Sequence, residues 1–203
     1  MSDTPKSPRS TVRRAPRRGT YSRDDLLEIL DEAWLCHVGV VDDGAPVVIP
    51  MSCWLYEERL MVHGSPRSRL MRLLLEGAAA CVTVTHLDGL VLARSAFHHS
   101  MNYRSVVLHG VATEVSDPQA RGAAFAAFVE KVEPGRWDRI RQPNDAELRA
   151  TTLLGFDIDE AAGKRRTGGP VDAPADLSHP VWAGVIPLAL TRGAPVRDGA
   201  AVE

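Results

Sequence analysis

Long apolar runs are absent from this sequence of 203 residues. No stretch approaches the roughly 20 apolar residues that a membrane-spanning helix needs. The first twenty residues also lack the apolar segment of a secretory signal. The pairs Arg13-Arg14 and Arg17-Arg18 are typical of twin-arginine export signals, but the residues after them are too polar for the apolar segment of such a signal. We therefore expect a cytoplasmic protein without a membrane partner.

Cysteine is scarce. The three cysteines, Cys36, Cys53 and Cys81, are odd in number and far apart in the sequence. Disulfide frameworks and structural zinc sites need closely spaced cysteines. Each cysteine lies in an apolar, strand-like stretch, so we expect small buried side chains. The adjacent pair His98-His99 does not indicate a metal site either, because neighbouring side chains of a strand point to opposite faces.

Three common catalytic and nucleotide-binding signatures are also missing. The sequence has no Gly-x-Gly-x-x-Gly, which argues against a Rossmann nicotinamide site. It has no Gly-x-Ser-x-Gly nucleophile elbow and no Walker phosphate loop. Regular alternation of strands and helices, which a doubly wound fold requires, is absent as well.

Positive charge is concentrated at the N-terminus. Residues 1–18 carry six basic side chains against one acid, a net charge of +5, which leaves −7 on residues 19–203. Such a Pro/Ser-rich basic segment is typical of a disordered, solvated arm. Nucleic-acid binding by the arm is the alternative. We do not expect a nucleic-acid partner, because the rest of the chain offers no basic face.

The pattern of the remaining chain predicts a mainly β protein with flanking helices. Short β-like runs are separated by turn signals, such as Asp42-Asp43-Gly44 and Leu87-Asp88-Gly89, that favour antiparallel hairpins. Helices are predicted at 22–33, 65–76 and 119–132, and the last strand at 147–159. Hairpin-joined strands with few helices indicate an antiparallel β-barrel, and an open sheet packed by helices is the alternative. We expect an arm at 1–18, a barrel domain at 19–162 and an irregular tail at 163–203.

Three segments could carry a binding site. At His63-Gly64-Ser65, a strand end and a glycine precede a helix start, where Arg67, Ser68 and Arg69 add donors suited to a phosphate. The segment from Phe97 to Ser105 supplies further donors, among them Arg104 and Ser105. Trp182 lies in an apolar stretch of the tail and could stack on a flat ring or fasten the terminus to the body. The alternatives are an ordinary capped helix and a polar loop that bonds its own backbone.

Taken as an ordered set, these segments resemble the pyridoxamine 5'-phosphate oxidase-like superfamily of FMN-binding split barrels. The closer similarity is to its nitroimidazole-resistance, nitroreductase-like branch, and it spans about Arg14 to Leu188. The motifs that carry the resemblance are Val47-Val48-Ile49-Pro50-Met51, His63-Gly64-Ser65 with Ser68-Arg69-Leu70, Asp88-Gly89-Leu90-Val91-Leu92-Ala93-Arg94-Ser95, His98-His99-Ser100-Met101-Asn102-Tyr103-Arg104-Ser105 and Trp182-Ala183-Gly184-Val185-Ile186-Pro187-Leu188.

The resemblance implies a split antiparallel β-barrel that forms a homodimer, with FMN in two clefts along the interface. The cofactor-binding residues that it implies are Ile49, Pro50, Met51, Ser52, His63, Arg67, Ser68, Arg69, Arg104, Ser105 and Trp182. Residues 49–52 would lie along the flavin ring with their backbone at its polar edge. Residues 67–69 would hold the phosphate with help from 104–105, and the tryptophan would approach the ring.

The resemblance also makes His63 the candidate catalytic residue. An imidazole near the flavin can donate a proton or orient a substrate, and a purely packing role is the alternative. Trp182 is not followed by the Arg-Leu-His-type motif of the vitamin B6 oxidases, so we do not expect that reaction. We predict an FMN-dependent oxidoreductase that reduces a small flat acceptor such as a nitroaromatic. A deazaflavin or haem ligand, and a flavin-binding sensor without turnover, are the alternatives.

Overall fold

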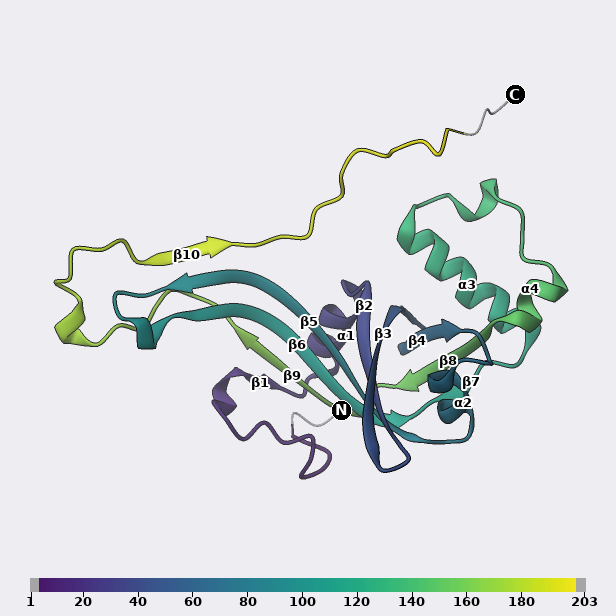
Figure 1. Ribbon diagram of the computed structural model, residues 1–203, viewed down its shortest axis with the longest axis horizontal. Helices are drawn as coiled ribbons and strands as arrows, with labels where there is room; N and C mark the ends of the chain where they lie inside the picture. The colour runs from purple at the N-terminus through teal and green to yellow at the C-terminus, as the bar shows by residue number, and fades with distance from the viewer. Residues whose placement is uncertain (1–3, 200–203) are drawn as a thin grey trace. The chain divides into compact units, whose positions relative to one another are not determined.

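Figure 1 shows the computed structural model, which describes residues 4–199. The chain divides into two compact units. The first comprises the residues up to 86 together with 103–166, and the second comprises 87–102 together with the residues from 167 onward. The three predicted segments, 1–18, 19–162 and 163–203, stay a prediction.

The first unit is built from antiparallel strands with flanking helices. Its elements are η1 (Pro16–Arg18), β1 (Gly19–Thr20), α1 (Arg23–Asp31), β2 (Leu35–Asp42), β3 (Ala45–Tyr56), β4 (Arg59–Gly64), α2 (Arg69–Leu75), most of β5 (Ala79–Leu92) and of β6 (Ser100–Val111), β7 (Thr113–Glu114), α3 (Pro118–Val132), η3 (Trp137–Arg139), α4 (Asp145–Ala150), β8 (Thr152–Asp157) and β9 (Glu160–Arg166). The strands follow the order β1-β9-β6-β5-β2-β3-β4-β8-β7. The predicted class, mainly β with flanking helices, is confirmed.

Strand β3 belongs to two sheets. Its residues 45–52 pair with β2 in the register Asp42↔Ala45 to Leu35↔Ser52. Its last four residues pair instead with β4, from Cys53↔Val62 to Tyr56↔Arg59. The predicted Asp43-Gly44 turn closes the first hairpin, and both residues have the positive φ that a two-residue hairpin turn requires. This twelve-residue strand therefore contributes eight residues to one sheet and four to the other.

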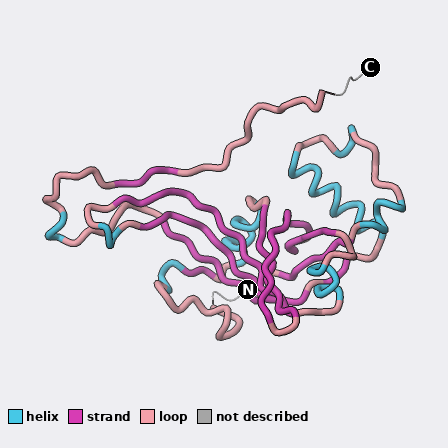
Figure 2. Tube along the Cα trace, viewed as in Figure 1, coloured by secondary structure: helices cyan, strands magenta, loops and turns pink. Residues whose placement is uncertain are grey.

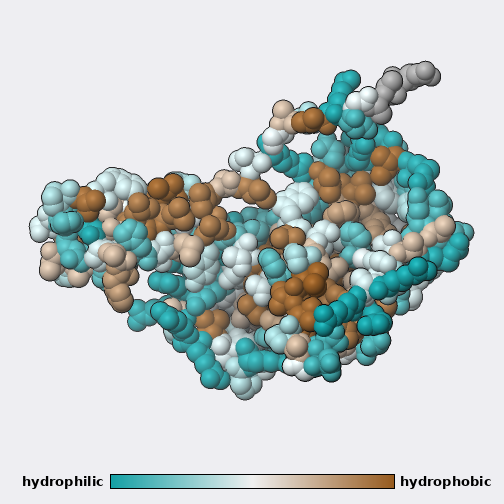
Figure 3. Space-filling view, viewed as in Figure 1, coloured by the Kyte–Doolittle hydropathy of each residue, from teal (hydrophilic) through white to brown (hydrophobic). Residues whose placement is uncertain are grey.

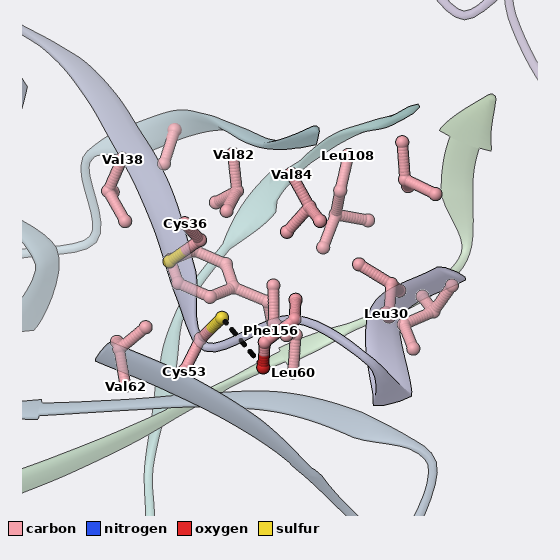
Figure 4. Close-up of a cluster of buried hydrophobic side chains, with 14 of the residues drawn as sticks. Leu30, Cys36, Val38, Cys53, Leu60, Val62, Val82, Val84, Leu108 and Phe156 are labelled. Carbon is pink, nitrogen blue, oxygen red and sulfur yellow. Dashed lines mark hydrogen bonds between the residues drawn. The ribbon is translucent and has the colours of Figure 1, made fainter. Parts of the chain in front are cut away.

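The core lies between the two sheets and α1 (Figure 4). It gathers fully buried side chains from distant parts of the chain, among them Leu30, Leu60, Val82, Leu108 and Phe156. Cys36 and Cys53 belong to this core, as predicted, whereas Cys81 is only partly buried. A second, smaller cluster lies under α3, where the Trp54 indole Nε1 donates a 3.0 Å hydrogen bond to the Ala124 carbonyl.

The second unit combines the ends of β5 and β6 with the C-terminal segment. It contains η2 (Ala96–His98), η4 (Pro174–Asp176) and β10 (Gly184–Pro187), and residues 167–183 run mainly as loop (Figure 2). Strand β10 pairs antiparallel with β5, from Gly184↔Leu92 to Pro187↔Gly89. An ion pair of 2.9 Å between Arg94 and the buried Asp172 carboxylate ties the segment down. Apolar side chains remain exposed along this unit (Figure 3).

Several elements differ from the sequence-based expectation. The hairpin expected with its turn at Leu87-Asp88-Gly89 is wrong, because β5 runs unbroken through these residues and its end pairs with β10. The predicted strand at 147–159 contains α4 and β8, because Asn144 and Glu147 form a capping box that starts a helix. Strand β9 continues to Arg166, past the expected start of the irregular tail, because it pairs with both β6 and β1. Helix α2 begins only at Arg69, since residues 65–68 form a turn.

The described part of the N-terminal arm contacts the first unit. Lys6 forms an ion pair with Asp159, and the Arg9 guanidinium makes two hydrogen bonds to the Glu160 carboxylate. The predicted disorder at residues 1–3 falls outside the described residues. None of the helices within residues 4–199 is both long enough and apolar enough to cross a membrane.

The complete burial of Leu60, where the two sheets meet, predicts how much its truncation destabilises the protein. Truncating the fully buried Leu60 to alanine should lower the free energy of unfolding by about 2–5 kcal/mol, because it leaves a cavity. Leu75→Ala, at an exposed leucine on α2, is the matched control and should cost less than about 1 kcal/mol. Urea unfolding of the two variants measures the difference. Equal losses would show that Leu60 is not a core residue.

Candidate functional site

The turn between β4 and α2 is tightly packed. A β-carbon on Gly64 would lie 3.0 Å from Met71 Cγ and 3.6 Å from Met51 Cε, so a larger residue would force Met71 to shift. Glycine lets the strand end approach α2 and β3 without that shift. The Ser68 amide donates to the Ser65 carbonyl at 3.0 Å, and Ser68 Oγ accepts a hydrogen bond from the Met71 amide at 3.3 Å. The turn is thus fixed against the core.

Three polar side chains stand on the exposed side of this turn. Arg67, Ser68 and Arg69 are all exposed, as a binding role for residues 67–69 requires. Arg69 forms an ion pair with Asp42 at the end of β2. Within residues 4–199, the Arg67 guanidinium makes no hydrogen bond or ion pair. This arrangement offers guanidinium groups to an anion at one end of the β2–β3 hairpin.

Residues 49–52 lie next to this turn, on an open strand edge. Their strand pairs with β2 on one side, and in the described residues its pairing with β4 begins only at Cys53. The other edge of residues 45–52 therefore presents peptide groups that a ligand can bond. Ile49 and Met51 point to the face that carries the buried Cys36, whereas Pro50 and Ser52 point to the opposite face.

Two predicted phosphate residues lie elsewhere. Arg104 pairs with Glu32 at 2.6 Å, just before the start of β2, whereas Arg69 pairs with Asp42 at its end. The length of β2 separates these ends, which places the two arginines roughly 20 Å apart within one chain. Ser105 donates from Oγ to the Lys164 carbonyl at 3.4 Å, on the opposite face of β6 from Arg104. One chain alone does not bring residues 67–69 and 104–105 together.

Trp182 lies in the second unit, beside β10. Its side chain is exposed, and its indole lies against Gly184, where a β-carbon would be 3.0 Å from a ring atom. An exposed, flat apolar surface of this kind can stack on a ring.

His63 lies at the end of β4 among aromatic rings. Its ring centroid is 5.7 Å from that of Trp54, 6.0 Å from Phe125 and 5.5 Å from Phe128. Burial lowers the pKa of His63 below its usual value of 6.5, which keeps the imidazole neutral. Its Nδ1 is buried and has no hydrogen-bond partner among the described residues.

The aromatic neighbours of His63 were not singled out from the sequence. Phe125 and Phe128 are three residues apart on α3, so their spacing predicts that they share a helix face. Nothing local in the sequence connects that face with Trp54 on β3. Among residues 4–199, no group of three or more His, Cys, Asp or Glu side chains is placed to hold a metal ion.

Comparison with known proteins identifies related chains. The sequence profile described as pyridoxamine 5'-phosphate oxidase matches residues 22–165. Curated proteins gave no match.

Two solved structures are similar over nearly the whole chain. The flavocytochrome Anf3 from Azotobacter vinelandii is 38% identical with a TM-score of 0.91, over 97% of this chain and 91% of that one. An FAD and haem binding protein from Mycobacterium smegmatis is 37% identical with a TM-score of 0.87, over 91% of each chain.

A more distant structure supports the fold alone. A 5-nitroimidazole antibiotic resistance protein from Bacteroides thetaiotaomicron is 21% identical with a TM-score of 0.59, over 71% of this chain and 84% of that one. The antiparallel half-barrel of this chain matches the split-barrel fold of these proteins, so the predicted split β-barrel is confirmed.

The low pKa of His63 predicts a pH dependence of stability. The unfolded chain takes up a proton at this ring before the folded chain does, so the free energy of unfolding should fall as the pH drops from about 7 to 5. His63→Phe, which keeps an aromatic ring but cannot titrate, should remove that part of the slope. Urea unfolding at several pH values measures it. Identical slopes in the two proteins would mean that His63 is solvated.

Proposed function

Because this chain belongs to the pyridoxamine 5'-phosphate oxidase family, we propose that it is a redox protein that binds a flavin and also haem. The observation that carries the proposal is the similarity to two solved proteins at 37–38% identity, one a flavocytochrome and the other an FAD and haem binding protein. That similarity covers more than nine-tenths of this chain, and therefore includes both units.

For the flavin, we propose FAD in place of the FMN predicted from the sequence. The support is the Mycobacterium smegmatis protein, an FAD and haem binding protein that is 37% identical to this chain. Either flavin carries a phosphate group for Arg67, Ser68 and Arg69, whose guanidinium and hydroxyl groups are open to solvent. The open edge of β3 at 49–52 is available to the polar edge of the ring. The approach of Trp182 to the ring stays a prediction from the sequence.

For haem, His63 is the histidine that fits best. Metal ligation needs a neutral imidazole, and burial among Trp54, Phe125 and Phe128 keeps this ring neutral. His86 donates from Nε2 to the Ile29 carbonyl, so that nitrogen is occupied. His99 donates from Nδ1 to the Ser95 carbonyl, which leaves its Nε2 as the second candidate ligand, but its ring is exposed. The role predicted from the sequence, proton donation beside the flavin, is the competing use of the same ring.

We further propose that the functional form is a homodimer. Leu35 and Val41 on β2 and Val48 on β3 are half or more exposed, and the strand register places them on one face of the sheet. Such an apolar face is stabilised by covering it with a second copy. A two-fold contact would also allow Arg104 of one copy to approach the turn at Arg69 of the other, which a single chain does not achieve.

A bound flavin supplies electron and hydride transfer, and the protein residues bind and orient it. Arg67 and Arg69 would hold its phosphate, and the peptide groups at 49–52 would bond the polar edge of its ring. The aromatic rings around His63 exclude water. A small flat acceptor such as a nitroaromatic stays a prediction, because the neighbour with that name is only 21% identical. A sensor without turnover would bind the same groups, but no acceptor in a substrate panel would oxidise its reduced flavin.

The bound groups can be identified directly. Native mass spectrometry of the purified protein should give a dimer that releases FAD, and the absorption spectrum should show a flavin band together with a haem Soret band. His63→Ala should remove the Soret band and leave the flavin band. A particle without flavin would overturn the proposed function. Release of FMN would show that the bound flavin is FMN and not FAD. A Soret band that persists in His63→Ala would show that another residue is the haem ligand.

The phosphate site has its own test. Arg67→Ala with Arg69→Ala should weaken flavin binding at least about tenfold, because each charged hydrogen bond contributes about 1.5–3 kcal/mol. The Ser68 cap of α2 is left intact in this variant. Arg136→Ala with Arg149→Ala removes two exposed arginines elsewhere and serves as the control. Titration of the apoprotein followed by flavin fluorescence measures both. Unchanged affinity in the first variant would place the phosphate away from this turn.

A further inference from the structure

Residues 13–18 form an exposed loop that carries four arginines. Arg13, Arg14, Arg17 and Arg18 are all exposed, and in the part of the chain that the structure describes their side chains make no ion pair or hydrogen bond. Many other arginines of the chain are paired with acids. Ion pairs join Arg9–Glu160, Arg23–Glu58, Arg59–Asp157, Arg104–Glu32, Arg141–Glu147 and Arg165–Glu28.

The loop is held in place at both ends. Before it, the Arg9–Glu160 pair and the hydrogen bond from the Val12 amide to the Tyr21 hydroxyl, at 2.8 Å, fix the chain. After it, Gly19 pairs with Lys164 on β9, which brings a further cation beside the loop. Within it, the Arg18 amide bonds the Ala15 carbonyl at 3.0 Å. The arginines are therefore presented on an ordered surface.

The exposure of the loop and the negative charge of the rest of the chain indicate a macromolecular partner whose acidic surface is no larger than the loop. Its residues are all exposed, whereas sites for small molecules are concave. Residues 19–203 carry −7, so a long polyanion reaching beyond the loop meets repulsion from the body. A compact acidic surface on a protein avoids that repulsion.

The chain itself presents a surface of this kind. A groove of about 470 Å³ between α1 and the β3–β4 turn is lined by five carboxylates over a floor of Leu27 and Leu55. The carboxylates are those of Asp24, Glu28, Asp31, Glu57 and Glu58. Arg165 pairs with Glu28 and Arg23 pairs with Glu58, so the other three carry the negative charge that the groove offers to a second copy. Among the described residues of one chain, no ion pair joins this groove to the arginine loop. The loop is positively charged and the groove is negatively charged, so each can bind the other on a second copy.

We propose that the arginine loop of one copy docks against this acidic groove of a second copy. The contact is distinct from the apolar face on β2 and β3, and it does not depend on a bound cofactor. Complementary charges steer and orient such an association, and salt weakens it. An apolar contact is not weakened by salt in this way. The charged contact is thus recognisable as a salt-sensitive step in self-association.

Charge reversal tests the contact on the full-length protein. By sedimentation velocity, the weight-average mass should fall between about 20 and 500 mM NaCl, as the Debye length shortens. Arg17→Glu with Arg18→Glu should weaken association at low salt at least about tenfold. Asp31→Lys with Glu57→Lys should do the same from the groove side. An equimolar mixture of the two variants should restore association, because each then meets the opposite charge.

The control is Arg136→Glu with Arg149→Glu, which changes the net charge equally at exposed arginines outside the loop. It should leave association as in the unaltered protein. Association that is insensitive to salt and to the loop variant would overturn the proposal. So would a mixture that fails to recover. Salt-sensitive DNA binding lost in the loop variant, with self-association unchanged, would assign the loop to nucleic acid instead.

Discussion

The change of partner along β3 is the constraint on which the rest of the structure depends. The first eight residues of this strand pair with β2 and the last four with β4, so two sheets share a single backbone. The core fills the space between them, and Cys53, the first residue that pairs with β4, is fully buried there. The same change of partner leaves residues 45–52 with one unpaired edge. A fold with a complete sheet at this point would have no peptide groups to offer a ligand.

The candidate site follows from that open edge and from a glycine. Because Gly64 lacks a side chain, the end of β4 lies directly against Met51 and Met71, and the turn that carries Arg67 and Arg69 is brought beside the open edge. His63, the preceding residue, points to the other side of β4 and joins the aromatic rings under α3. Adjacent residues of one strand thus serve two different environments, one open to an anion and the other dry and apolar.

Local signals in the sequence predicted local structure well. The Asp43-Gly44 turn and the burial of Cys36 and Cys53 follow from turn chemistry and from apolar patterning. The same turn chemistry failed at Leu87-Asp88-Gly89, where β5 continues as a strand. Features that depend on distant segments were not predictable in this way. Strand β9 continues to Arg166 because β1 and β6 lie on either side of it, and His63 is desolvated by rings on a helix far along the sequence. The separation of Arg69 from Arg104 likewise depends on strand order, which spacing along the chain does not encode.

The ion pair between Arg69 and Asp42 has a consequence for ligand selection. The carboxylate holds the guanidinium extended before any ligand arrives, so little side-chain entropy is lost on binding. The Asp42 carboxylate also competes with ligands, because an incoming anion must displace it or share the guanidinium with it. A neutral ligand gains nothing from that exchange. The linked phosphates of a dinucleotide bring two negative charges against the one of the carboxylate, so the pair favours anionic ligands.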